Sequence, residues 1–177
     1  MKSSTIAAGA AGLLALAGCS QARQIPDAPP VQSLRTELTD VNGRRVGDAT
    51  LQQLPHGVLI IADLSALPSG THAMHIHETA QCTPPFTSAG GHFNPTSARH
   101  GFRDPAGPHA GDLPNIHVPT SGTLRIELIA EGLMLGGTGG LLDADGAALV
   151  IHQFADDYSS DPAGAAGDRI ACGALVR

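Results

Sequence analysis

The sequence predicts an all-β fold, an antiparallel Greek-key barrel or sandwich of about eight short strands. Short apolar or alternating segments recur from residue 31 onward, and Gly, Pro and Asx residues separate them. No segment has a convincing helical period. Two long stretches lack a strand pattern altogether, and we expect them to be long functional loops. The expected fold is therefore an eight-stranded antiparallel Greek-key barrel with two such loops.

Residues that favour turns separate the first expected strands. The eight strands are expected at residues 31–38, 46–54, 58–64, 73–78, 115–118, 123–129, 147–152 and 170–176. The Asn42-Gly43 pair is a strong hairpin signal between the first two. Val58-Leu59-Ile60-Ile61 is nearly continuous, which predicts a central position for the third strand. Pro68-Ser69-Gly70 breaks the chain before the fourth.

The later strands enclose two long loops. Residues 79–113 are rich in Gly, Pro, Ser and Asn, and residues 153–169 form the second loop. A loop as long as the first is unusual in a compact domain unless a bound metal or a disulfide orders it. Between the loops, residues 123–129 alternate apolar with charged side chains, which predicts a sheet with one face in water.

The amino terminus has the pattern of a secretory signal. Lys2 gives a short positive region, and residues 6–17 are apolar and small but too few to span a membrane. The segment ends in Leu16-Ala17-Gly18-Cys19, which resembles the lipobox of bacterial lipoproteins. We therefore expect residues 1–18 to be a signal peptide, Cys19 to carry lipid, residues 19–30 to form a proline-containing tether, and residues 31–177 to form the domain. The alternatives are ordinary signal cleavage nearby and a Cys19 that has no role.

Export places the remaining cysteines in an oxidising compartment. With Cys19 lipidated, Cys82 and Cys172 form an even pair, and one structural disulfide is the most economical assignment; two free buried thiols are the alternative. Loss of Lys2 with the signal leaves nine arginines against 16 acidic residues, a net charge of −7 with neutral histidines. Because no Lys/Arg run could neutralise a row of phosphates, nucleic acid is excluded as an expected partner.

Histidines gather in the middle of the chain. Seven of the nine lie between His72 and His117. Neutral imidazole is a mediocre core residue and a weak surface charge, but it is the commonest protein ligand for zinc and copper. His75 and His77 are two residues apart in an expected strand, so their side chains project to one face and can reach one metal. The clustering predicts a metal centre.

The donors fall into two sets with different preferences. Three nitrogens and one oxygen suit tetrahedral zinc with no open position, and the long loop supplies them from His92, His100, His109 and Asp112. Imidazole suits copper in both oxidation states, and the remaining donors are His75, His77 and His152. Local spacing alone does not fix this division.

Six stretches together resemble a bacterial periplasmic copper,zinc superoxide dismutase. They are His72-Ala73-Met74-His75-Ile76-His77-Glu78, Ser88-Ala89-Gly90-Gly91-His92-Phe93-Asn94-Pro95, Arg99-His100-Gly101, His109-Ala110-Gly111-Asp112-Leu113, Val150-Ile151-His152 and Gly167-Asp168-Arg169-Ile170-Ala171-Cys172-Gly173. They follow the family's order across residues 31–177. The resemblance implies that the chain dismutes superoxide to dioxygen and hydrogen peroxide, with copper cycling between Cu(II) and Cu(I) and zinc sharing a bridging histidine.

The resemblance also implies a role for each site residue. The implied copper ligands are His75, His77, His92 and His152. The implied zinc ligands are His92, His100, His109 and Asp112. Asp156 would hydrogen-bond His75 and His100 and fix their tautomers. His92 would also supply a proton, and Arg169 above the copper would attract and hold the superoxide anion.

Location and assembly follow from the family and the lipobox together. We expect antioxidant defence in the periplasm, with the lipid on Cys19 anchoring the protein to the outer membrane, since Ser20 is not the aspartate associated with inner-membrane retention. The oligomeric state stays open between a monomer and a homodimer. Asp168 beside Arg169, and a mature chain without lysine, predict weaker electrostatic steering of superoxide than in lysine-rich relatives. His56 and His117 match no motif.

Binding without catalysis is the competing class. A tethered copper or zinc buffer, or a dismutase-like domain without activity, would be favoured by a missing His152 or Arg169, and both residues are present. A purely structural barrel would not explain why every ligand position is filled. The sequence therefore favours the enzyme.

Overall fold

The computed structural model describes residues 32–177, and nine strands lie within this range. They are β1 (Ser33–Asp40), β2 (Arg45–Leu54), β3 (Gly57–Leu64), β4 (Gly70–His72), β5 (Met74–His77), β6 (Ile116–Val118), β7 (Leu124–Glu131), β8 (Ala147–His152) and β9 (Arg169–Leu175). A short 3-10 helix, η1 (Thr87–Ala89), lies in the first long loop. The predictions for the signal peptide, Cys19 and the tether lie outside the described residues.

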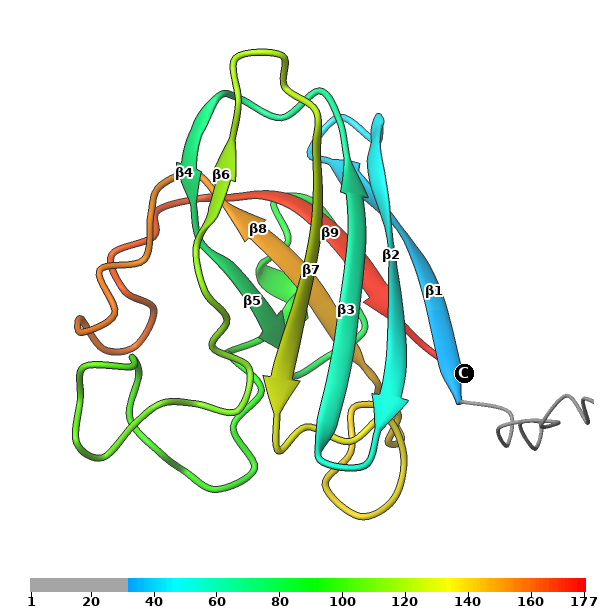
Figure 1. The fold of residues 1–177 in the computed structure, drawn as a ribbon, viewed down its shortest axis with the longest axis vertical. Coiled ribbons are helices and arrows are strands. Elements are labelled where there is room, and N and C mark those ends of the chain that lie inside the picture. The colour runs from blue at the N-terminus through cyan, green and yellow to red at the C-terminus, as the bar shows by residue number, and fades with distance from the viewer. Residues whose placement is uncertain (1–31) are drawn as a thin grey trace, which may run out of the picture.

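Seven of these strands form one curled antiparallel sheet in the order β5-β8-β9-β1-β2-β3-β7 (Figure 1). β4 and β6 pair separately, and because β4 leads into β5 through Ala73 while β6 precedes β7, this small sheet lies beside both edges of the large one. β3 pairs with β7, β5 with β8 and β9 with β1, so three pairs of neighbouring strands in the sheet are not consecutive in the chain. This arrangement confirms the predicted antiparallel Greek-key fold.

β4 is the one strand that the sequence prediction lacked. The sequence predicts a break at Pro68-Ser69-Gly70, but Gly70, Thr71 and His72 pair with Val118, His117 and Ile116 of β6. A strand of three residues has too few positions to show alternation, so only its partner defines it. The described bounds of the other eight strands lie within two residues of those expected.

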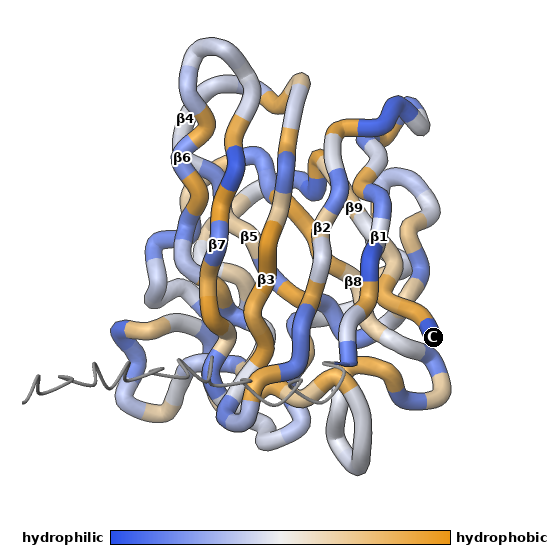
Figure 2. The backbone as a smooth tube through the Cα atoms, turned by 45° about the vertical axis from the view of Figure 1, so that its right-hand side comes forward, coloured by the Kyte–Doolittle hydropathy of each residue, from blue (hydrophilic) through white to orange (hydrophobic). Residues whose placement is uncertain are grey.

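Alternating side chains of the central strands build the main core. Val58, Ile60 and Ala62 of β3 are buried, whereas Leu59 and Ile61 between them are half-buried, and β3 lies between β2 and β7 as expected. β8 is buried on both faces. Figure 2 shows β3 and β8 as mainly hydrophobic. Each fully buried Ile or Val contributes about 1.5–3 kcal/mol to stability.

Among residues 32–177 no helix is long and apolar enough to cross a membrane.

The two faces of β8 pack against different partners. Leu149 and Ile151 point into the main core. Ala148 and Val150 point the other way, toward Phe86 and Cys172 in a second, smaller cluster. The first long loop therefore has its own apolar contact with β8 and β9 of the barrel.

Candidate metal centre

The edge strand β5 brings the loop donors to the strand donors. One side of β5 pairs with β8, and its other side pairs with the first long loop through the isolated bridges His75↔Asp112 and His77↔His92. The Ile76 amide donates to the Gly111 carbonyl at 2.9 Å, which continues this contact. Backbone groups at a buried sheet edge need partners, and here the loop supplies them. The same contacts set four metal-binding side chains beside one another.

Four buried imidazoles form the first cluster. Their donor atoms all lie within 4.8 Å of one another, and the residues are His75, His77, His92 and His152. The ring centroids of His75 and His92 are 4.0 Å apart, and Nε2 of His77 lies 3.3 Å from Nε2 of His152. β5, the first long loop and the end of β8 each contribute to this cluster, so the fold brings together residues up to 77 positions apart in the chain.

Three imidazoles and a carboxylate form the second cluster. Its members are His92, His100, His109 and Asp112. The Nδ1 atoms of the three histidines lie 2.8, 3.1 and 3.2 Å from Oδ1 of Asp112. Zinc–nitrogen and zinc–oxygen bonds of about 2.0 Å in a tetrahedron would separate neighbouring ligand atoms by roughly 3.3 Å, so the spacing fits that ion.

Two unpaired nitrogens show that the clusters are built for cations. Nδ1 of His75 and Nε2 of His92 are buried and have no hydrogen-bond partner among the described residues. Leaving a buried polar atom unsatisfied costs about 1–3 kcal/mol, and a metal ion would satisfy both. Since Nδ1 of His92 faces the second cluster, its ring is shared by both clusters. The residues present therefore fit two metal ions on either side of one imidazole.

Hydrogen bonds behind the rings hold them in position. Oδ2 of Asp156 accepts from Nε2 of His75 at 2.8 Å, and Oδ1 accepts from Nε2 of His100 at 3.0 Å. This carboxylate therefore spans the two clusters. Nδ1 of His77 donates to the Gly90 carbonyl at 3.0 Å. Each contact fixes which nitrogen carries the proton and leaves the opposite nitrogen available to a metal.

Burial keeps the imidazoles of the first cluster neutral. Burial, and then the nearby charge of Arg169, lower the pKa of His77 to about 2. Burial and then His75 lower the pKa of His152 to about 3. Burial also lowers the pKa of His92 to about 4, although the hydrogen bond with Asp112 raises it in part. At pH 7 these rings present lone pairs rather than positive charges to a cation.

Both buried carboxylates stay ionised. Burial alone would raise the pKa of Asp112, but hydrogen bonds from His92 and the Gly101 amide outweigh it and hold the pKa well below its usual range. Burial likewise opposes ionisation of Asp156, whereas hydrogen bonds from the two histidines that it contacts lower its pKa to about 2. The negative charges compensate the positive charge that bound metals bring.

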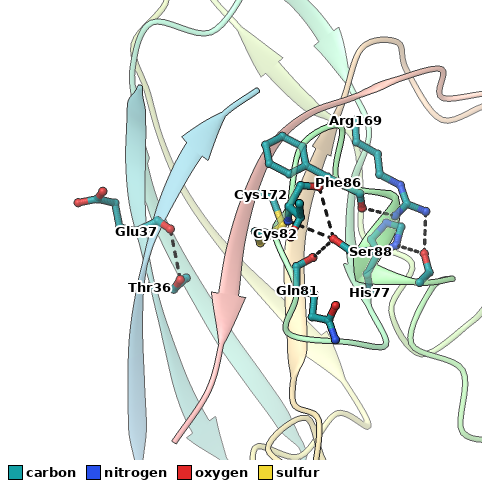
Figure 3. Close-up of a disulfide and its surroundings, with 11 residues drawn as sticks. Thr36, Glu37, His77, Gln81, Cys82, Phe86, Ser88, Arg169 and Cys172 are labelled. Atoms are coloured by element: carbon teal, nitrogen blue, oxygen red, sulfur yellow. Dashed lines mark hydrogen bonds between the residues drawn. A yellow bond between two sulfur atoms is a disulfide. The ribbon is translucent and has the colours of Figure 1, made fainter. Parts of the chain in front are cut away.

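Arg169 is fixed beside the first cluster by loop carbonyls. Nη1 donates to the Phe86 carbonyl and Nη2 to the Gly90 carbonyl, both at 2.7 Å (Figure 3). Arg169 pairs with His152 in the ladder between β8 and β9, and its guanidinium is half-buried. It lines an open cavity of about 700 Å³ together with Asp168. A small anion that enters this cavity meets a fixed cation.

The predicted disulfide is confirmed. Cys82 in the loop and Cys172 in β9 are bonded across 90 positions, with their Cα atoms 5.6 Å apart (Figure 3). The bond lies in the small apolar cluster with Phe86. The disulfide therefore attaches the loop to the barrel next to Phe86 and Gly90, whose carbonyls hold Arg169.

Comparison with known proteins identifies the family. Residues 45–175 match the family model described as copper/zinc superoxide dismutase. The chain belongs to this family. The superoxide dismutase (Cu-Zn) 1 of Aquifex aeolicus is 48% identical over 150 residues, which cover 81% of this chain and 89% of that protein.

Solved structures agree with this assignment. A SOD-like protein from Bacillus subtilis has a TM-score of 0.77 and 38% identity, over 80% of this chain and 97% of that one. The Cu/Zn superoxide dismutase from Brucella abortus has a TM-score of 0.66 and 25% identity, over 81% and 99% of the two chains. As a copper/zinc superoxide dismutase, the protein is an oxidoreductase that dismutes superoxide, with copper and zinc as cofactors. The predicted family, activity and cofactors are confirmed.

Some site contacts were outside the sequence prediction. Tyr158 and Asn115 touch Asp156, and no motif or spacing marked either of them. His72 is buried, with its two ring nitrogens next to the carbonyl oxygens of His152 and Pro68. His117 pairs with the Thr71 hydroxyl at 3.0 Å. Only the folded structure brings these partners together.

Proposed function

We propose that the two clusters divide the family's metals according to their donor atoms. The proposed copper ligands are His75, His77, His92 and His152. The proposed zinc ligands are His92, His100, His109 and Asp112. Four imidazoles suit copper in both oxidation states, and three nitrogens with one carboxylate oxygen suit tetrahedral zinc. The observation that carries the proposal is the His92 ring: one nitrogen lies in the second cluster, and the other lies in the first without a hydrogen-bond partner in the described part of the chain.

The chain's own residues would then bind the substrate and handle a proton. Bound copper supplies the one-electron chemistry that turns two superoxide ions and two protons into dioxygen and hydrogen peroxide, next to the positive charge of zinc. Arg169 holds the anion through N–H groups that point away from the loop carbonyls. Nε2 of His92, which has no hydrogen-bond partner among residues 32–177, would take up a proton when copper does not hold it and pass that proton to the reduced oxygen species. Asp156 keeps the protons of His75 and His100 on the far side of each ring.

Metal content of single variants tests this division. His152→Ala should lower the copper content and leave the zinc content unchanged. His109→Ala should lower the zinc content more than the copper content. Both metals are quantified per protein molecule in the sample whose superoxide decay is followed by pulse radiolysis. The wild type should accelerate decay in proportion to its copper. If His152→Ala loses zinc and retains copper, the ligand assignment is reversed. If the wild type binds copper but superoxide decays no faster than in protein-free solution, the protein is a metal-storing protein and not an enzyme.

We also propose that the protein is an exported lipoprotein of the periplasm. The support is the signal pattern of residues 1–18, the lipobox at Cys19, the proline-containing segment 19–30 as a tether, and a disulfide of the kind that persists in oxidising compartments. Ser20 favours the outer membrane. Membrane fractionation should place the wild type with outer-membrane vesicles and Cys19→Ala in the soluble periplasmic fraction. Equal distribution of the two proteins would argue against lipidation.

A further inference from the structure

Tyr158 follows Asp156 by two residues and contacts three of the segments around it. The Tyr158 amide donates to Oδ1 of Asp156 at 2.6 Å, the oxygen that also accepts from His100. The Tyr158 carbonyl accepts from the Arg103 amide at 3.0 Å. The Tyr158 hydroxyl accepts from the Asn115 amide at 2.8 Å. One residue of the second long loop therefore contacts three separate backbone segments.

The first of these segments follows His100 directly. The Tyr158 ring packs edge-on against Phe102 with centroids 5.4 Å apart, and the Arg103 guanidinium lies 5.9 Å above it. The Tyr158 carbonyl approaches Gly101 so closely that a Cβ atom there would collide with it. The Gly101 amide in turn donates to Oδ2 of Asp112 at 2.9 Å. Tyr158 thus holds the backbone between two members of the second cluster.

Asn115 closes the arrangement into a ring of contacts. Its side-chain amide donates to the Asp156 carbonyl at 2.9 Å, and its Oδ1 accepts from the Asp156 amide at 2.8 Å. Because the Asn115 backbone amide donates to the Tyr158 hydroxyl, the three residues Asn115, Asp156 and Tyr158 restrain one another. The carboxylate of Asp156 has little freedom to turn away from His75 and His100.

The backbone of Tyr158 is strained, which calls for a reason. Its φ of +62° lies in the left-handed region, where the Cβ atom of an L-residue is crowded by the backbone, and this conformation is a genuine outlier for a bulky side chain. Such strain persists only where surrounding contacts over-determine the conformation, and it gathers at functional sites. Here the strained conformation lets the amide, carbonyl, ring and hydroxyl reach four different partners.

We propose that Tyr158 is a positioning residue that locks Asp156 between the two metal sites. It acts through Asp156 and the Gly101–Arg103 segment, and so sets how tightly the second cluster retains zinc and how His75 is presented to copper. The inference rests on the ligand division proposed above. Removing outer hydrogen-bond partners of metal ligands commonly weakens metal binding 10–100-fold.

Two substitutions separate the parts of this contact. Tyr158→Phe removes only the hydroxyl that holds Asn115, whereas Tyr158→Leu also removes the ring that packs against Phe102. Phe154→Leu is the matched control, because Phe154 is an exposed aromatic residue of the same loop whose ring lies beside Gly167. Each full-length protein is loaded with copper and zinc, and zinc transfer to a chelator is followed at 25 °C. Electron paramagnetic resonance of the cupric site is recorded on the same samples.

We expect Tyr158→Leu to release zinc at least tenfold faster than the wild type and to change the cupric spectrum. Tyr158→Phe should release it about threefold faster, and the control should stay within twofold. A role in stability alone would lower the unfolding temperature and leave zinc release and the spectrum unchanged, which overturns the proposal. If Tyr158→Leu does not fold, the test rests on Tyr158→Phe: a rate of zinc release equal to that of the wild type overturns the proposal. A wild type that retains no zinc in the second cluster would contradict the ligand division instead.

Discussion

His92 is the residue on which both clusters depend. Nδ1 lies 2.8 Å from Asp112, and Nε2 faces the first cluster without a partner among residues 32–177. Imidazole is the one side chain that carries two nitrogen donors on opposite sides of a rigid ring. A carboxylate can also bind two ions, but its two oxygens share one carbon and would hold the ions closer together. Histidine therefore suits the shared position, because its two nitrogens face the two clusters from opposite sides of one ring.

Asp168 is the residue that we expect to slow the approach of superoxide. It lines the same cavity as Arg169 and carries the opposite charge. At roughly 8 Å in water a unit charge changes the energy of an anion by about 0.5 kcal/mol, so Asp168→Asn should raise the superoxide rate constant about twofold at low ionic strength. Pulse radiolysis measures the rate, and Asp145→Asn in a distant turn is the control. The gain should vanish at high salt, and a slower variant would contradict this account.

Protonation of the buried histidines should control the stability of the metal-free protein. The pKa values of His77, His92 and His152 are about 2, 4 and 3 in the folded state, against 6.5 when unfolded. Below pH 6.5 the unfolded chain therefore binds more protons, so the free energy of unfolding falls as the pH drops. The loss should be about 1 kcal/mol per histidine between pH 7 and 5.5.

Urea unfolding of the disulfide-intact apoprotein at the two pH values measures this difference. Asp112 and Asp156 should add to the loss only below their unfolded pKa of 3.8. A free energy of unfolding that is unchanged or larger at pH 5.5 would show that these rings are not held neutral.

Among the elements, β5 and the first long loop define the site together. The loop pairs with the free edge of β5, and this pairing places Asp112 beside His75 and His92 beside His77. Alternation within a strand predicted that the two β5 histidines share a face, because that relation is local. The pairing of the loop with β5 could not be derived from residue patterns, since it depends on contacts between distant segments.

The disulfide should support both the loop and the arginine. Replacing Cys82 and Cys172 by serine removes a cross-link over 90 positions, which should lower the free energy of unfolding by roughly 4–5 kcal/mol. The Phe86 and Gly90 carbonyls that fix Arg169 would then be held less firmly, so the superoxide rate constant should fall as well. Chemical denaturation and pulse radiolysis of the same sample measure the two effects. Wild-type values in both would contradict the anchoring role.

At the scale of the whole molecule, local patterns in the sequence predict strands and turns, but they do not predict contacts between distant segments. Turn residues and alternation located eight strands, whereas β4 needed its partner β6. Donor chemistry grouped His152 with His75 and His77, whereas Asp156 could be assigned only through family resemblance, because nothing local links it to His75. Tyr158 could not be predicted as a site residue, because a single tyrosine in a polar loop forms no pattern and its contacts with Phe102 and Asn115 exist only after folding.

The division of two metals across one histidine ring is the central claim, and anomalous X-ray diffraction tests it most directly. Crystals of the oxidised protein loaded with copper and zinc are measured at the absorption edges of both elements. The account predicts a copper peak at bonding distance from Nε2 of His92 and a zinc peak at bonding distance from Nδ1. A single peak, exchanged elements, or a metal bound away from both nitrogens would contradict it.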